Sequence, residues 1–407
     1  MTIDVEQARA ETPGVANVIH FNNAGCSLPP QRVVEAMVDH LRLEAAIGGY
    51  EAHERRHDAV ERPYDALAGL LNCSRDEISI QENATRAWDM AFYSLPLKAG
   101  DRILTGQSEY CSNYMGFLHA ARRSGVVIEV VPNDRYGQIS TEALEAAINE
   151  RVKLIAITHV PTSGGLVNPA EAVGRIARRA GITYLLDACQ AVGQMPLDVE
   201  VLGCDILSGT GRKFLRGPRG TGFLYVRRSL LDRLDPPFIA DHAATWCADN
   251  RYALRDDARK FETPECSFAA RIGLGIAIDY AMELTLPAIW DRVTALARTL
   301  RNRLEEIPGT LLHDSGRERC GIVTFSLDMI PAEEVQESLA RGGINTTVAV
   351  QEATRLDMAP RGLNQIVRAS VHYYNTEAEI DAFTTAVRAI ARGEPSHAMS
   401  MSITKRG

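Results

Sequence analysis

Two side chains that could do chemistry together stand at the ends of apolar stretches of this chain. Lys213 follows the apolar residues 206–207 and a run of small residues, and a loop rich in glycine, proline and arginine comes after it. Asp187 closes a second apolar stretch, 182–186. Such a lysine can form a Schiff base with pyridoxal phosphate (PLP), and such a carboxylate keeps the pyridine nitrogen of PLP protonated, so that the ring accepts electrons. Alone, each side chain is more simply a surface lysine or a helix N-cap; together they predict a PLP site.

Further candidates follow predicted strands, which is where ligands bind in open α/β sheets. The N–H groups of Ala84 and Thr85, with the Thr85 hydroxyl, open a helix and can hold a phosphate, although a simple N-cap explains this segment equally well. Tyr110 can lie flat on a planar ring or be an ordinary loop tyrosine. Gln190 can hydrogen-bond the phenolic oxygen of PLP, and Arg212 can pair with its phosphate.

Arg368 is the main candidate for binding a substrate. It stands within the strand-like stretch 366–371, and a guanidinium suits bidentate capture of the α-carboxylate of an amino acid. An exposed structural arginine is the equal alternative. We also predict a cofactor contact for Thr162, which follows another strand, and substrate contacts for Asn23 and Ala24 near the N-terminus.

The order of the predicted elements indicates an α/β fold. The expected strands are 77–80, 102–105, 126–131, 154–158, 184–186, 206–207 and 222–226, and the expected helices between them are 87–95, 114–123, 141–150, 170–180 and 230–234. This alternation predicts a mostly parallel seven-stranded sheet with helices on both faces. A long helical stretch through residue 304, strands at 321–327 and 367–371, and a helix from Ala332 predict a smaller α+β unit.

We therefore divide the chain into an N-terminal segment (1–30), a large PLP-binding α/β domain (31–265), a small C-terminal α+β domain (266–393) and a polar tail (394–407). The 407 residues are 24% charged with a net charge of −8, which argues against nucleic acid as the main partner. No apolar run reaches the roughly 18 residues that span a bilayer, and the N-terminus does not resemble a signal peptide. The 8 cysteines form no CxxC pair. We therefore predict no metal site and a cytoplasmic protein.

On these motifs, the chain resembles the class V aminotransferases of the PLP-dependent fold type I group. It is most similar to their cysteine desulfurase, isopenicillin N epimerase and ergothioneine-pathway C–S lyase branch, and the specific pieces are residues 187–190, 210–222 and 367–376. The resemblance implies the PLP-dependent transferase fold type I and Lys213 as the Schiff-base lysine, with the other side chains in the roles given above. It also implies a homodimer with shared active sites, in which Thr263 reaches the site of the partner subunit.

The chain departs from a desulfurase in two ways. Tyr110 and Arg212 stand where desulfurases usually carry histidines, and residues 344–351 lack the mobile cysteine that a desulfurase needs. We therefore expect a C–S β-lyase, similar to hercynylcysteine sulfoxide lyases, that acts on a cysteine S-conjugate or sulfoxide and releases pyruvate and ammonia. A class V epimerase or aminotransferase would use the same residues. A non-catalytic scaffold is the third alternative, which the intact lysine, aspartate and arginine disfavour.

Overall fold

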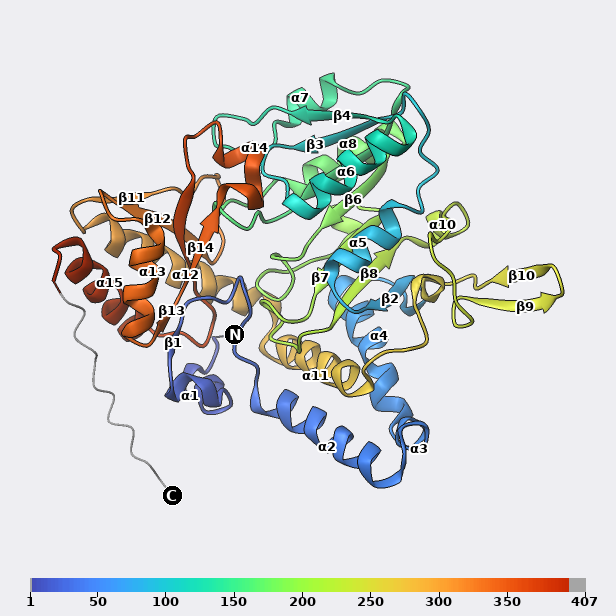
Figure 1. Cartoon of the computed structure of the whole chain (residues 1–407), viewed down its shortest axis with the longest axis horizontal. Coiled ribbons are helices and arrows are strands. Elements are labelled where there is room, and N and C mark those ends of the chain that lie inside the picture. The colour runs from blue at the N-terminus through green and yellow to red at the C-terminus, as the bar shows by residue number, and fades with distance from the viewer. Residues whose placement is uncertain (1, 395–407) are drawn as a thin grey trace.

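The computed structural model describes residues 2–394, so the predicted polar tail lies outside the described residues except for Glu394. Its largest feature is a seven-stranded sheet with the order β2-β8-β7-β6-β5-β3-β4 (Figure 1). The strands β3 to β7 are parallel to their neighbours, whereas β8 is antiparallel to β7 and β2 is antiparallel to β8. The strands are β2 (Ile78–Gln81), β3 (Arg102–Gly106), β4 (Val127–Val131), β5 (Val152–Thr158), β6 (Thr183–Asp187), β7 (Ile206–Thr210) and β8 (Gly222–Val226). The predicted α/β fold with a mostly parallel sheet is confirmed.

Helices cover both faces of this sheet because successive strand side chains point to opposite sides. Tyr184 and Leu186 of β6 belong to one apolar core, together with buried residues of α4, α8 and α11. Leu185 belongs to a second core with residues of α5 and α6. The helices around the sheet are α2 (Gln31–Ile47), α3 (Gly49–Arg55), α4 (His57–Leu71), α5 (Ala84–Phe92), α6 (Cys111–Ser124), α7 (Thr141–Ala146), α8 (Ala170–Ala180), α9 (Val199–Leu202), α10 (Arg228–Leu231) and α11 (Phe268–Leu284).

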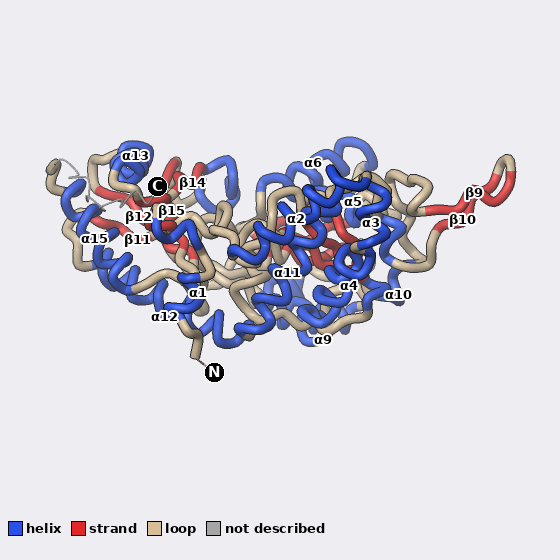
Figure 2. The backbone as a smooth tube through the Cα atoms, turned by 90° about the horizontal axis from the view of Figure 1, so that it is seen from below, coloured by secondary structure: helices blue, strands red, loops and turns tan. Residues whose placement is uncertain are grey.

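A smaller unit is built on a four-stranded antiparallel sheet with the order β11-β12-β15-β14, and Figure 2 shows the two sheets as separate groups of strands. Its strands are β11 (Thr310–Leu312), β12 (Ile322–Leu327), β14 (Thr347–Val350) and β15 (Gln365–Ser370), and its helices are α12 (Leu286–Glu305), α13 (Ala332–Arg341), α14 (Arg355–Met358) and α15 (Glu377–Ala391). Side chains of α12, α13 and α15 form its core with β12 and β15.

The N-terminal segment joins the small unit. After α1 (Val5–Ala10), the strand β1 (Ile19–His20) pairs in parallel with β13 (Ile344–Asn345). Asn22 then forms a bridge with Ser370 at the end of β15. This bridge places the residues after Asn22 between the small unit and the large unit.

The long helical stretch that the sequence predicts after residue 265 is two helices. Thr285 lies between α11 and α12 with a φ of 66°, which ends the first helix, and its hydroxyl caps the second. Because α11 packs on α2 and α4, we propose that the large unit ends and the small unit begins at Thr285. No single helix among residues 2–394 is long and apolar enough to cross a membrane, and α11 and α12 meet that test only as a pair bent by 79°.

Candidate active site

Four strands of the large sheet end at one cavity. The carboxyl ends of β3, β5, β6 and β7 share one edge because these strands are parallel. The cavity there has a volume of about 480 Å³. It is lined by Asn83, Ala84, Thr85, Tyr110, Asn113, Thr158, Val160, Thr162, Asp187, Cys189, Gln190, Thr210, Arg212 and Lys213. The structure thus brings together every residue predicted to contact the cofactor except Thr263.

The side chain of Lys213 lines this cavity and is buried. Its exposed fraction is 8%. Burial lowers the pKa of the Lys213 amine from its ordinary value, the positive charges of Arg212 and Arg368 lower it further, and Asp187 acts in the opposite direction. A larger fraction of the amine is therefore neutral, which is the form that attacks a carbonyl group or accepts a proton.

Asp187 closes β6 and is held by two donors. Its Oδ1 accepts a hydrogen bond from the Cys189 N–H at 2.8 Å, and its Oδ2 accepts one from Asn113 Nδ2 at 2.8 Å. Burial raises the pKa of the carboxyl group, while these two hydrogen bonds and the charge of Lys213 lower it. The carboxylate is therefore fixed in orientation and suited to a cationic partner in the cavity.

The first turn of α5 forms another wall. Asn83 caps this helix, since its side chain accepts a hydrogen bond from the Arg86 N–H at 2.8 Å. The N–H groups of Ala84 and Thr85, in the first turn beyond the cap, have no intrahelical acceptor and can bind an anion. The predicted N-cap is present at Asn83, and phosphate binding at Ala84 and Thr85 stays a prediction that this cap does not exclude.

A turn of the N-terminal segment connects the two units beside the cavity. Gln190 Nε2 donates to the Ala24 carbonyl oxygen at 3.0 Å and to Thr162 Oγ1 at 3.2 Å. Arg212 donates to the Gly25 carbonyl oxygen. Gln190 Oε1 is buried and has no hydrogen-bond partner among residues 2–394. A ligand in the cavity can therefore meet an amide group that the fold itself leaves unsatisfied.

Arg368 reaches this region from β15. Its Nη1 donates to Thr162 Oγ1 at 2.5 Å and to the Thr162 carbonyl oxygen at 3.2 Å, while Nη2 lies 3.4 Å from Asn22 Oδ1. Its Nε has no partner within the described residues. Burial, together with the charge of Arg212, lowers the pKa of Arg368 to about 10. Arg368 Nε therefore has hydrogen-bonding capacity that the described fold does not use.

Two predicted contacts differ from this arrangement. Asn23 does not line the cavity, because its Nδ2 donates to the Ser370 carbonyl oxygen at 2.7 Å and its Oδ1 accepts from the Tyr374 hydroxyl. Both groups of its side-chain amide are hydrogen-bonded within the fold, and the substrate contact of Asn23 stays a prediction. Thr263 lines a separate, small cavity beside Gln81 and Thr221.

Sequence reasoning assigned no role to Asn113, Thr158 or Cys189, which all line the cavity. The spacing of Glu109 and Asn113, four residues apart at the start of a helix after a strand, was a signal that could have indicated a polar pair facing the same ligand. Cys189 lies next to Lys213, whose charge lowers the pKa of its thiol, although burial has the larger effect and raises it.

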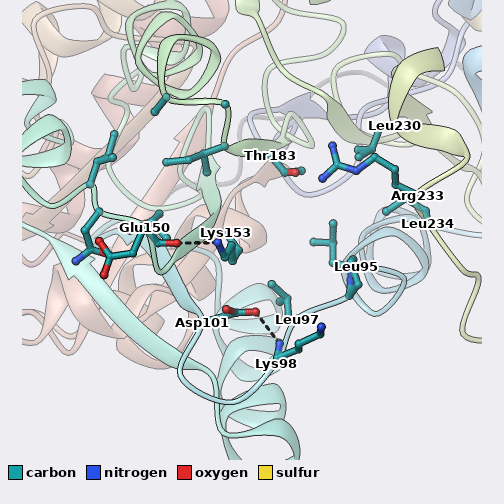
Figure 3. Close-up of a pocket in the computed structure, with 17 residues that line it drawn as sticks. Leu95, Leu97, Lys98, Asp101, Glu150, Lys153, Thr183, Leu230, Arg233 and Leu234 are labelled. Carbon is teal, nitrogen blue, oxygen red and sulfur yellow. Dashed lines mark hydrogen bonds between the residues drawn. The ribbon is translucent and has the colours of Figure 1, made fainter.

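A larger cavity of about 610 Å³ lies at the opposite edge of the same sheet, where β5 and β6 begin (Figure 3). Its polar groups are partly used locally, since Lys153 Nζ donates to the Glu150 carbonyl oxygen at 2.7 Å and the Lys98 N–H donates to Asp101 at 2.8 Å. Ligands of open α/β sheets bind outside the carboxyl ends of strands. We therefore assign the active site to the cavity that contains Lys213.

The site defines a class of enzyme. A buried lysine of lowered pKa, a fixed carboxylate and a free helix N-terminus fit the aldehyde, ring nitrogen and phosphate of PLP. Residues 19–383 match the model of the Aminotransferase class-V family, so the chain belongs to that family. PLP is accordingly its cofactor, as the sequence predicts.

Known proteins of similar sequence and structure agree with this assignment. A probable cysteine desulfurase of Xylella fastidiosa (strain Temecula1) is 31% identical over 397 residues, which cover 94% of this chain and 95% of the relative. The apo structure of a cysteine desulfurase from Thermococcus onnurineus NA1 has a TM-score of 0.90 at 26% identity, covering 97% of this chain and 99% of that one. A C-DES mutant with glycine covalently linked to its PLP cofactor has a TM-score of 0.85 at 21% identity, covering 93% of this chain and 98% of that one.

Proposed function

We propose that this chain is a C–S β-lyase that cleaves a cysteine S-conjugate or a cysteine sulfoxide and releases pyruvate and ammonia. One observation carries the choice of lyase over desulfurase. Thr347 of β14 pairs with Arg368 of β15, so residues 344–351 lie beside the carboxylate-binding arginine. No cysteine occurs in that stretch, and the sulfur must therefore leave with the product rather than on a protein thiol there.

The residues of the cavity divide among the parts of the cofactor. We assign the phosphate to the first turn of α5, at Ala84 and Thr85, with Arg212 as a further cation. Asp187 takes the protonated ring nitrogen, Tyr110 takes one face of the ring, and Gln190 with Thr162 takes its phenolic oxygen. These assignments rest on the positions of the side chains around one cavity.

Lys213 carries the proton transfers of the proposed reaction. Bound PLP supplies the electron sink for the carbanion at the substrate Cα. The Lys213 amine, whose pKa burial lowers, removes the α-proton. The C–S bond then breaks with both electrons on sulfur, which leaves as a thiol or sulfenic acid after taking up a proton. One water is consumed when the remaining three-carbon unit becomes pyruvate and ammonia.

The substrate is an amino acid held by its α-carboxylate. We assign that carboxylate to the Nε–Nη2 edge of Arg368, whose Nη1 is already fixed by Thr162. Asn23 and Ala24 support this contact indirectly, because they hold the turn that includes Asn22. We further propose that the enzyme is a cytoplasmic homodimer.

An epimerase or aminotransferase of the same family is the second candidate, since it would use the same lysine, aspartate and arginine. It differs only in the fate of the carbanion after the α-proton is removed. A non-catalytic scaffold would have no reason to bury a lysine of lowered pKa beside a fixed carboxylate.

The test is the product formed from S-substituted cysteines and their sulfoxides. We expect pyruvate and ammonia in equal amounts from the wild-type protein, and no pyruvate from Lys213→Ala. Cys189→Ser is the matched control for a thiol mechanism, and we expect its rate to stay within about threefold of the wild type. Racemised substrate, or amino transfer to a keto acid, without pyruvate would contradict the lyase. Loss of activity in folded Cys189→Ser would indicate a protein thiol as sulfur acceptor.

A further inference from the structure

Glu109 is a buried carboxylate directly behind the cavity to which the proposed function gives no role. It follows β3, and its exposed fraction is 4%. Its Oε2 accepts a hydrogen bond from Thr105 Oγ1 at 3.0 Å. Its Oε1 accepts hydrogen bonds from the Tyr110 N–H at 2.9 Å, from Asn113 Nδ2 at 2.9 Å and from Thr158 Oγ1. One side chain thus joins the ends of β3 and β5 to the start of α6.

Asn113 extends this network to Asp187. Its Nδ2 donates to Glu109 Oε1 at 2.9 Å and to Asp187 Oδ2 at 2.8 Å. A primary amide carries two N–H groups on that nitrogen, so each carboxylate receives one. Glu109 therefore determines which way the Asn113 amide faces. A reversed amide would present its oxygen to both carboxylates.

Glu109 also controls the residue assigned to the ring face. The Tyr110 N–H donates to Glu109 at 2.9 Å, which fixes the backbone where α6 begins. Glu109 is therefore hydrogen-bonded both to Asn113, which holds Asp187, and to the backbone of Tyr110. Neither anchor touches the substrate.

The surroundings of Glu109 raise the pKa of its carboxyl group. Burial raises the pKa of Glu109 to about 7, and the charge of Asp187 on β6 adds to this, while the hydrogen bonds from Thr158, Asn113 and the Tyr110 N–H lower it. The groups that face it from β3, β5 and α6 are the neutral Thr105, Thr158 and Asn113. Protonation removes the charge that strengthens the hydrogen bonds to Oε1, even where the O–H lies on Oε2 and donates to Thr105 Oγ1, so it weakens the network.

We propose that Glu109 is the positioning residue that orients Asn113 and Tyr110, and through Asn113 holds Asp187 against the ring nitrogen. This inference rests on the proposed function. The direction of the expected pH dependence follows from these contacts, because the ionised carboxylate accepts all four hydrogen bonds. Turnover should accordingly fall as the pH decreases through the pKa of Glu109.

Two substitutions separate charge from position. Glu109→Gln keeps the shape and one acceptor toward Asn113, and its amide can donate to Thr105, but it does not titrate. Because its neutral amide resembles the protonated carboxyl group, we expect its kcat near pH 8 to be lowered to about the level that the wild type reaches toward about pH 6, with no further decrease at low pH. Glu109→Ala removes the acceptors. We expect kcat to fall by about tenfold or more while KM for the substrate stays within about twofold, because Arg368 is untouched.

Two further measurements exclude a merely structural role. If Glu109 acts through Asp187, then Glu109→Ala should lower kcat little further, by about twofold at most, when Asp187→Asn is already present. The pH titration of the absorbance of bound PLP should shift in Glu109→Ala and not in Ser108→Ala. Ser108 is the matched control, since it is a buried residue of the same turn whose hydroxyl, among residues 2–394, accepts a hydrogen bond only from Asn168, at 3.2 Å.

Several outcomes would overturn the inference. One is a Glu109→Gln variant whose kcat still decreases toward low pH as in the wild type. Another is a folded Glu109→Ala variant with unchanged kcat and absorbance titration. A third is a double variant in which the fold-decreases of kcat from Glu109→Ala and Asp187→Asn multiply. If Glu109→Ala does not fold, the pH profile of Glu109→Gln decides. A wild-type protein that binds PLP but releases no pyruvate contradicts the proposed lyase instead, and the absorbance titrations still test Glu109.

Discussion

Lys213, Arg212 and Arg368 place three positive charges around the cavity, and each lowers the pKa of a neighbour. Neither Arg212 nor Arg368 forms an ion pair with a carboxylate among residues 2–394. Unpaired, half-buried or buried guanidinium groups are costly unless an anion reaches them. A phosphate and an α-carboxylate are the two anions that the proposed reaction brings. The charges of the site therefore agree with its proposed ligands.

Substitution of Arg368 tests the substrate contact. Arg368→Ala should lower kcat/KM by about a hundredfold or more, since roughly 1.4 kcal/mol corresponds to each factor of ten and a charged hydrogen bond contributes about 1.5–3 kcal/mol. Arg368→Lys keeps the charge but loses the second N–H of the fork, so it should recover only part of the loss. PLP absorbance should not change in either variant. Unaltered kcat/KM, or loss of PLP, would show that Arg368 does not bind the carboxylate.

The main candidate residues could be predicted because their surroundings are local. Lys213 and Asp187 each follow an apolar stretch that the sequence shows directly. The role of Asn113 could not be predicted in this way, because it depends on the alignment of β3, β5 and β6, which brings Glu109 and Asp187 to the two sides of one amide. The same long-range packing gives the amide of Asn23 a structural role.

The regular alternation of strands and helices was predictable because both faces of the sheet are buried. The hairpin of β9 (Ala244–Ala248) and β10 (Arg251–Leu254) was not predicted. It projects from the body of the structure in Figure 1 and has few buried residues, so it leaves no periodic apolar pattern. The edge strand β11 was missed for the same reason, since its residues are only partly buried.

The first turn of α5 packs closely against Gly222 of β8. A Cβ at Gly222 of β8 would lie 2.4 Å from the Asn83 carbonyl carbon and 2.7 Å from the Ala84 nitrogen. Gly222→Ala should therefore displace the first turn of α5, destabilise the fold by about 1–3 kcal/mol and weaken PLP binding. Thermal unfolding without PLP and a PLP titration measure the two effects. Gly69→Ala, in α4 with open space around its Cβ, is the control, which should retain PLP affinity. Equal PLP affinity in both variants would contradict phosphate binding by the first turn of α5.

The N-terminal turn, residues 22–25, links the two units at the cavity. The Ala24 carbonyl oxygen accepts from Gln190 of the large unit, and the Ala24 N–H donates to Ser370 Oγ of the small unit at 2.9 Å. The guanidinium groups of Arg212 and Arg368 also contact this turn, at Gly25 and Asn22. Relative movement of the units would therefore disturb the substrate contact and the PLP contacts together.

We propose that a second copy of the chain completes the site. Thr263 lines a cavity apart from the one that contains Lys213, and exposed apolar side chains on the projecting hairpin, with Trp246 79% and Tyr252 52% exposed, offer a surface for a partner. We expect a homodimer in which Thr263 contacts the PLP phosphate of the partner subunit. Thr263→Ala should weaken PLP binding by about tenfold or more, because a hydrogen bond to a charged group contributes about 1.5–3 kcal/mol.

Mixed dimers decide whether the sites are shared. If Lys213 and Thr263 of one site come from different chains, a dimer of one Lys213→Ala and one Thr263→Ala chain contains one intact site and one doubly altered site. Random reassociation of the two inactive or weakened variants should then restore roughly a quarter of the sites. The matched control mixes Lys213→Ala with Arg368→Ala, whose residues belong to the same chain at each site, so no intact site can form. Restoration in neither mixture, although size measurements show a dimer, would place Thr263 away from the site of the partner subunit.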